Sequence, residues 1–242
     1  MAKTAGIVII GNEVLSGKTQ DINSHFFCTE LRQLGVEVQK ISTIQDEIPL
    51  IGKEVAECSQ RFDLVFTSGG VGPTHDDVTI EGIAHGFGVK VVRHPDIEAR
   101  LRRRLGADLN EARLRMANVP EGATLLCADA PFAPIVQMRN VYVFPGIPKI
   151  LQERFHSIKE QFRDAPYYLK NVYVRHGEGI IATMLNDLLV KYPALMLGSY
   201  PVLDLPEYKV KVTLESKDQK YLTQALETFV ASLPKDSVHR ID

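Results

Sequence analysis

Short apolar runs alternate with helical patterns through the first two thirds of the chain, and this alternation constrains the fold more than any other feature. The runs are continuous in Val and Ile, which is typical of strands that helices cover on both faces. The predicted strands lie at residues 6–10, 37–44, 63–67, 89–92, 125–126, 135–138 and 141–144. The predicted helices lie at residues 23–34, 48–58, 77–87, 95–105 and 148–162. This order predicts an α/β domain with a mostly parallel sheet.

The pattern changes near residues 163–166. The predicted order then becomes strand, helix, strand, strand, helix, at residues 169–174, 180–192, 196–200, 208–214 and 219–233. Two strands in direct succession do not fit the alternation before them. We therefore expect an α/β domain over residues 1–165 and a small α+β domain over residues 166–242.

The composition excludes several classes of protein. Hydrophobic residues make up 45% of the 242 residues, which is ordinary for a globular protein with a buried core. A formal net charge of -2 gives no reason to expect binding to nucleic acid or to an anionic membrane, and no apolar stretch approaches a membrane span. The three cysteines, Cys28, Cys58 and Cys127, lack Cys-x-x-Cys spacing, which predicts a reducing, cytoplasmic location without disulfides.

Seven arginines between residues 93 and 115 form the one basic cluster that bears on ligand binding. They are mixed with acidic residues and have no aromatic neighbours on which bases could stack. This pattern favours a solvated face, although one of these arginines could reach a ligand phosphate.

The turn at residues 67–79 carries the most chemistry and reads Thr-Ser-Gly-Gly-Val-Gly-Pro-Thr-His-Asp-Asp-Val-Thr. It joins a predicted strand to a predicted helix, where glycines and free backbone N–H groups favour a phosphate. Two adjacent carboxylates, Asp76 and Asp77, would repel that phosphate unless a cation lay between them. Their hard oxygens suit Mg2+, Mn2+ or a similar divalent ion.

The alternative is that Asp76 and Asp77 only cap the following helix, because Thr74 stands three residues before Asp77 in a capping-box spacing. A simple cap does not need three glycines directly upstream, so the turn favours a phosphate-and-metal site. The glycines and threonines that would bind the phosphate are Gly69, Gly70, Gly72, Thr74 and Thr79.

A second glycine loop, Gly11-Asn12-Glu13-Val14-Leu15-Ser16-Gly17-Lys18-Thr19, follows the first predicted strand. A P-loop has four residues between its glycines and this loop has five, and Glu13 would oppose a phosphate held there. One interpretation is a plain connection to a helix that Asp21 or Asn23 caps. The other is that Glu13, Asp21 and Asn23 line the same crevice as the first turn, because ligands lie beyond the carboxyl ends of parallel strands.

A third turn, Phe144-Pro145-Gly146-Ile147-Pro148, also leads from a strand to a helix. It is either a stiff connection with Pro148 at a helix start, or a place where Gly146 exposes N–H groups to the same ligand. The sequence leaves these two interpretations open.

Together the three turns resemble the molybdopterin-binding-domain superfamily. The closest resemblance is to its CinA-like branch, which includes the amino-terminal domain of eukaryotic FAD synthase. The Gly-Pro-Thr-x-Asp-Asp-x-Thr form at residues 72–79 is specific to that branch, whereas Asn12 replaces the Asp that usually precedes Glu13. The resemblance implies a three-layer α/β/α domain followed by a small KH-like α+β domain. The second domain lacks the Gly-x-x-Gly loop that clamps nucleic acid in KH domains, so no nucleic-acid partner is expected.

The resemblance also implies an activity, namely metal-dependent hydrolysis of a nucleotide pyrophosphate such as ADP-ribose or FAD. We expect a divalent metal (Mg2+, Co2+ or Mn2+), with K+ as a further ion, and a homo-oligomer, since relatives form dimers or trimers. In this hypothesis Asp76 and Asp77 hold the metal, and Glu13 or Asp21 orients the attacking water or a second cation. The alternatives are an adenylyltransferase acting on molybdopterin, and a module that binds a nucleotide or pterin without turnover.

Overall fold

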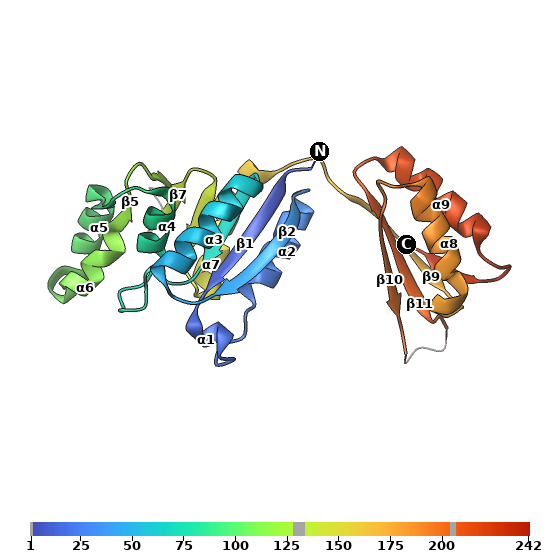
Figure 1. Ribbon diagram of the computed structural model, residues 1–242, viewed down its shortest axis with the longest axis horizontal. Coiled ribbons are helices and arrows are strands. Elements are labelled where there is room, and N and C mark those ends of the chain that lie inside the picture. The colour runs from blue at the N-terminus through green and yellow to red at the C-terminus, as the bar shows by residue number, and fades with distance from the viewer. Residues whose placement is uncertain (1, 128–133, 204–206) are drawn as a thin grey trace. The chain divides into compact units, whose positions relative to one another are not determined.

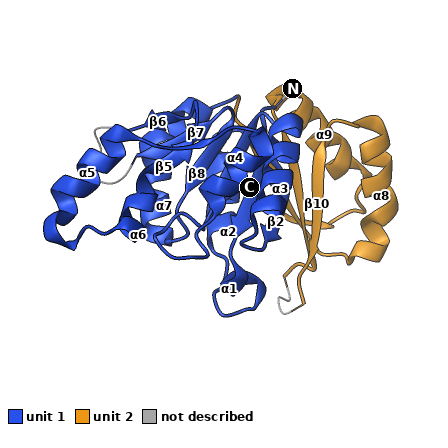
Figure 2. Cartoon of the chain, turned by 60° about the vertical axis from the view of Figure 1, so that its left-hand side comes forward, with its two compact units in different colours: residues 1–164 blue, residues 165–242 orange. Residues whose placement is uncertain are grey.

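The computed structural model describes residues 2–127, 134–203 and 207–242. It divides into two compact units, Met1–Asp164 and Ala165–Asp242, which Figure 2 shows in blue and orange. Each unit is described by itself.

The first unit is built on a six-stranded sheet in the order β2-β1-β3-β8-β7-β6 (Figure 1). The first four strands run parallel, and the last two pair antiparallel at one edge. Their bounds, in sheet order, are Glu37–Ile44, Thr4–Ile10, Leu64–Ser68, Val141–Phe144, Ile135–Met138 and Thr124–Leu126. The predicted mostly parallel sheet is confirmed.

The strand predicted at residues 89–92 exists but lies outside the main sheet. It forms β4 (Val91–Arg93), which pairs antiparallel with β5 (Asn118–Pro120) in a separate two-stranded sheet. Its partner comes from more than twenty residues further along the chain, and local patterning cannot show such a pairing.

Alternating side chains of the buried strands divide the core of this unit into two. Ile7 and Ile9 of β1 pack with α2 (Asn23–Gln33) and α7 (Pro148–Ile158) in one core. Val8 and Ile10 pack with α3 (Ile48–Arg61) and α4 (Thr79–Phe87) in the other. Since neighbouring strand residues point to opposite faces, helices cover both sides of the sheet. This is the expected three-layer arrangement.

The remaining helical segments of this unit are short or peripheral. They are α1 (Asn12–Leu15), α5 (Pro95–Leu105), α6 (Glu111–Leu114), and 3-10 turns at Gly106–Asp108, Arg115–Ala117 and Lys159–Phe162. Ile97 of α5 packs with Ala117 and Val119 in a satellite core beside β5.

The second unit has a four-stranded antiparallel sheet in the order β10-β11-β9-β12. The bounds of these strands are Met196–Pro201, Val210–Ser216, Tyr168–Val174 and Val238–Ile241. Helices α8 (Glu178–Lys191) and α9 (Gln219–Ser232) share one core with the sheet. The sequence predicted the first five elements, and the structure adds the last strand, β12.

No helix in the described part of the chain could cross a membrane, because none combines the necessary length with sufficient apolar character. The longest helices, such as α8, have 14 residues, and a span needs about 20.

Candidate functional site

All four parallel strands of the first unit end in a turn with polar or glycine residues, at the same edge of the sheet. The register places Ile10 beside Ile44 and Ser68 beside Phe144, so the strand ends are level. The residues that follow are Gly11 after β1, Asp46 after β2, Gly69 after β3 and Gly146 after β8. The carboxyl edge of a parallel sheet is where such folds bind ligands.

The turn after β3 requires glycine for steric reasons. Gly69 has a φ of +110°, and a Cβ atom there would lie 2.0 Å from the carbonyl oxygen of Ile10. Gly70 has a φ of +62°, and a Cβ there would lie 2.4 Å from Oγ1 of Thr79. L-amino acids with side chains rarely adopt such backbone conformations, so both glycines shape the turn.

The free N–H groups of this turn begin at Gly70, one residue later than expected. The Gly69 N–H donates to the carbonyl of Phe144 at 3.2 Å, so it is not available for the predicted diphosphate. The amides of Gly70, Val71 and Gly72 make no hydrogen bond among the described residues. These three N–H groups form the available anion cradle.

Thr74 and Thr79 stabilise the turn by hydrogen bonds within it. Thr79 is fully buried, and its hydroxyl donates to the carbonyl of Gly69 at 2.9 Å. The backbone N–H of Thr74, at 2.8 Å, and its hydroxyl both donate to Oδ2 of Asp77. The hydroxyl hydrogens that we expected on phosphate oxygens are therefore committed within the turn. The bond from the Thr74 N–H to Asp77 is one that a capping box makes, but it closes the turn at residues 74–77, whereas α4 begins after Val78 without a side-chain cap.

The neighbouring carboxylates Asp76 and Asp77 differ in position. Asp77 lines the cavity described below, whereas the side chain of Asp76 is 55% exposed beside an almost fully exposed His75. Asp77 is thus the better placed of the two to face a ligand.

Asp46 is a site residue that the sequence analysis missed. Its Oδ2 accepts a hydrogen bond from the Asn12 N–H at 2.8 Å. Burial raises the pKa of Asp46, and the charges of Glu13, Asp76 and Asp77 raise it further. These four carboxylates therefore interact across the crevice, as their like-charge effect requires. The available signal was an acidic residue just beyond the strand predicted at residues 37–44.

Asn23 and Asp21 support the site without lining the cavity. The Asn23 amide donates to Oγ of Ser68 at 3.0 Å and to the carbonyl of Gly146 at 2.8 Å, so it ties two strand-end turns together. Asp21 Oδ1 accepts from the N–H groups of Asn23 and Ser24, which makes it the cap of α2. The Gly146 turn belongs to the site, because a Cβ on Gly146 would lie 3.5 Å from Cα of Gly69.

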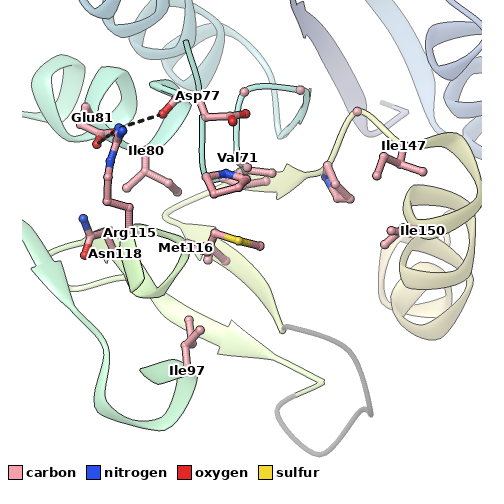
Figure 3. A pocket seen from close by; sticks show the side chains of 18 of the residues that line it. Val71, Asp77, Ile80, Glu81, Ile97, Arg115, Met116, Asn118, Ile147 and Ile150 are labelled. Atoms are coloured by element: carbon pink, nitrogen blue, oxygen red, sulfur yellow. Dashed lines mark hydrogen bonds and ion pairs between the residues drawn. The ribbon is translucent and has the colours of Figure 1, made fainter. Parts of the chain in front are cut away.

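A cavity of about 470 Å³ opens above these turns (Figure 3). That volume falls within the range of about 300–1,000 Å³ of ordinary ligand pockets. Glu13, Gly70 and Asp77 lie on its polar side. The other walls are mainly aliphatic, with Ile147 and Ile150 on α7 and a group on or near the peripheral helices that includes Ile97 and Met116.

Arg115 connects the peripheral helices to the polar turn, whereas Arg102, Arg103 and Arg104 of the same cluster are exposed, as expected of a solvated face. Its guanidinium donates to the carbonyl of Thr74 at 3.3 Å. It also donates to the carbonyl of Asp77 and to Oε1 of Glu81, each at 3.3 Å (Figure 3). The signal for this contact was weak, because an arginine in a mixed-charge segment gives no local sign of its partners.

The carboxylates of the site suit a hard divalent cation that is held together with a bound phosphate and water. Among the described residues, no three His, Cys, Asp or Glu side chains gather closely enough to form a complete metal cage. Mg2+ is, however, usually held by one or two carboxylates together with substrate phosphates and water. Asp77 beside the free amides of Gly70 to Gly72 provides that kind of partial shell, and the charge of Asp76 adds to it.

Comparisons with known proteins agree with this architecture. The family model described as "Probable molybdopterin binding domain" matches residues 6–164, and that described as "FAD synthase, middle domain" matches residues 166–242. A "Probable FAD synthase" of Caenorhabditis elegans is 34% identical over 96% of this chain and 49% of its own length. A protein of Archaeoglobus fulgidus is also 34% identical, over 92% of this chain and 95% of its own length.

A "CinA-like protein" of Fusobacterium nucleatum is 31% identical over 77% of this chain and 48% of its own length. Among solved structures, the protein CinA of Thermoplasma acidophilum, described as of unknown function, superposes with a TM-score of 0.61 at 29% identity. That match covers 67% of this chain and all of the other. The chain spans about half the length of the FAD synthases that it matches.

Proposed function

The chain belongs to the family of probable molybdopterin binding domains, with CinA-like proteins and FAD synthases among its relatives, and from that premise we propose that it cleaves the diphosphate bond of a nucleotide such as ADP-ribose or FAD. The observation that carries the proposal is the juxtaposition of three free backbone N–H groups with the carboxylate of Asp77 at one side of a ligand-sized cavity. Amides alone would suit any anion. Carboxylates at the same place suit a phosphate that arrives with a cation.

The amides of Gly70, Val71 and Gly72 would bind and orient the phosphate that is attacked. Because the turn is already fixed by the Thr79 and Asp77 hydrogen bonds, little conformational entropy is lost when the ligand binds. Asp77, with the charge of Asp76 beside it, would hold a divalent cation, which when bound supplies Lewis-acid stabilisation of charge on phosphorus.

The proton of the attacking water would pass to a carboxylate. Glu13 lines the cavity, and Asp46 combines a raised pKa with an Oδ2 already engaged by Asn12, so its Oδ1 is the atom left to accept a proton. A bond forms between the water oxygen and one phosphorus, the bridging P–O bond breaks, and two phosphate monoesters leave.

The proposal is tested by incubating the protein with ADP-ribose, FAD and other dinucleotides, each with Mg2+, Mn2+ or Co2+ and with or without K+. We expect two monophosphate products from at least one substrate, and their loss in Asp77→Asn. Substrates that all stay intact under every metal would contradict the proposal.

A second candidate is an adenylyl transfer to a pterin, which the match to a molybdopterin-binding model favours. It would use the same amides and carboxylates. Incubation with ATP and molybdopterin, followed by a search for an adenylylated pterin, separates the two reactions. Tight nucleotide binding by calorimetry without any product would instead indicate a binding module.

A further inference from the structure

Arg154 lies on the face of α7 that lines the cavity. Ile147, Ile150 and Arg154 line the cavity, at spacings of three and four residues that place them on the same side of a helix. Leu151 and Phe155 are fully buried in the core on the other side. Arg154 is therefore held against the cavity by the packing of its own helix.

The two cavity arginines differ in their partners. Arg115 is engaged by Glu81 and two backbone carbonyls. Arg154 makes no side-chain hydrogen bond or ion pair among the described residues, and its Nε is buried without a partner. Burial also lowers the pKa of the Arg154 guanidinium. A guanidinium with a buried Nε and no anion among the described residues is unfavourable, so a ligand that supplies the anion would relieve that cost.

The surroundings of Arg154 favour a phosphate as that anion. Ile147 and Ile150 are apolar neighbours on the same wall, and the Nε of Arg154 is itself buried, which strengthens a charge-assisted hydrogen bond there. The guanidinium presents paired donors that match phosphate oxygens, which lysine cannot reproduce. The carboxylates of the site cluster instead around the turns after β1, β2 and β3, which suits a phosphate there that arrives with a cation and leaves Arg154 for a different phosphate.

We infer that Arg154 binds the second phosphate of the ligand and so makes the site selective for diphosphates over monophosphates. The first phosphate would lie on the amides of Gly70 to Gly72. This inference rests on the nucleotide ligand of the proposed function, but not on its turnover.

The test is a pair of affinities measured by calorimetry with Mg2+ present, for AMP and for the non-cleavable α,β-methylene-ADP. We expect the wild-type protein to prefer the diphosphate analogue by about tenfold or more, the usual contribution of a desolvated charge-assisted contact. Arg154→Gln should reduce this preference to near unity while AMP binds as before. Arg154→Lys should retain an intermediate preference, because it keeps the charge but loses the paired donors.

Lys149→Gln is the matched control, because it removes one positive charge from an exposed position of the same helix that does not line the cavity. It should keep the wild-type preference. The inference is overturned if Arg154→Gln keeps the preference, if it weakens both ligands equally, or if the wild-type protein shows no preference or binds neither ligand. Loss of the preference in Arg154→Gln, in a protein that cleaves no dinucleotide, would uphold this inference and reject the proposed hydrolysis.

Discussion

The two units use similar elements, yet among the described residues the polar and acidic turns converge at one sheet edge in the first unit and not in the second. Its four parallel strands all end on the same side, so the turns after β1, β2, β3 and β8 converge. In the second unit every strand pair is antiparallel, so the ends of strands that are neighbours in the sheet alternate between opposite edges. Sheet direction thus decides whether separate loops can form one site.

The same residue types consequently serve different purposes. In the second unit Asp218 accepts hydrogen bonds from the N–H groups of Lys220 and Tyr221 and caps α9. In the first unit Asp77 lies before a helix too, but its carboxylate accepts from Thr74 and faces the cavity. An Asp before a helix can therefore be a cap, as Asp21 and Asp218 are, or face a cavity beyond a parallel strand, as Asp77 does. Matched substitutions in the two units test this difference.

The largest contrast is expected from removing one carboxylate charge in each unit. Asp77→Asn should lower the rate of dinucleotide cleavage about a hundredfold or more, as loss of one well-placed electrostatic group in an active site does. Asp187→Asn, at an exposed position of α8, should leave the rate unchanged. Steady-state kinetics measure both, and Asp76→Asn should have a smaller effect than Asp77→Asn because Asp76 is exposed. Equal effects of Asp76→Asn and Asp77→Asn would contradict the ranking.

The same Gly-to-Ala change should have opposite signs in the two units. Gly69→Ala places a Cβ against the Ile10 carbonyl at a positive φ, and should destabilise the first unit by about 2–3 kcal/mol. Gly179→Ala lies in α8 with open space around the new Cβ, and should stabilise the second unit by about 0.5 kcal/mol. Hydrogen exchange of the strand amides measures each unit separately. The prediction is contradicted if Gly179→Ala destabilises the second unit, or if Gly69→Ala leaves the stability of the first unit unchanged.

The sequence predicted those parts of the molecule that depend on local patterns. Continuous Val and Ile runs predicted the buried parallel sheet, and the Gly-Pro-Thr-x-Asp-Asp-x-Thr turn predicted the family, and both are confirmed. β12 was missed because it is a four-residue edge strand, Val-His-Arg-Ile, too short to show a period. The functional roles of the site residues, the metal, the homo-oligomer and the cytoplasmic location stay predictions.

The site residues that were missed are those defined by tertiary contacts. Asp46 follows a strand without any glycine to mark it, and its environment arises from carboxylates on two other loops. Arg115 and Arg154 lie on helical segments whose patterns explain them as surface residues. Only the packing of those segments around the cavity shows which arginine is partnered and which is not.

A threonine hydroxyl bonded to a backbone carbonyl offers a finer comparison. Thr79 donates to Gly69 in a fully buried site, and Thr223 donates to Gln219 on the exposed side of α9, both at 2.9 Å. Thr79→Val should destabilise the first unit by about 1–2 kcal/mol, because the Gly69 carbonyl loses its partner away from water. Thr223→Val should change stability by less than about 0.5 kcal/mol, because water replaces the bond. Hydrogen exchange measures the loss of stability in each unit. Equal losses for Thr79→Val and Thr223→Val would contradict this prediction.

The smallest effect concerns the pH dependence of the first unit. Burial and neighbouring carboxylates raise the pKa of Asp46 above its ordinary value of 3.8 in the folded state. Between the two values the folded protein holds a proton that the unfolded chain has released, so the stability contributed by this group falls as pH rises through that window. Asp46→Asn cannot ionise and keeps an oxygen to accept from the Asn12 N–H. It should therefore stabilise the first unit at neutral pH, by less than about 1 kcal/mol because solvent screens a half-buried carboxylate, and give no gain below pH 3.8. Asp187→Asn in α8 is the control, and melting of the two variants across this pH range should diverge only for Asp46→Asn. A gain that is the same at every pH would mean that packing, and not the charge of Asp46 among its neighbours, limits the stability of this edge.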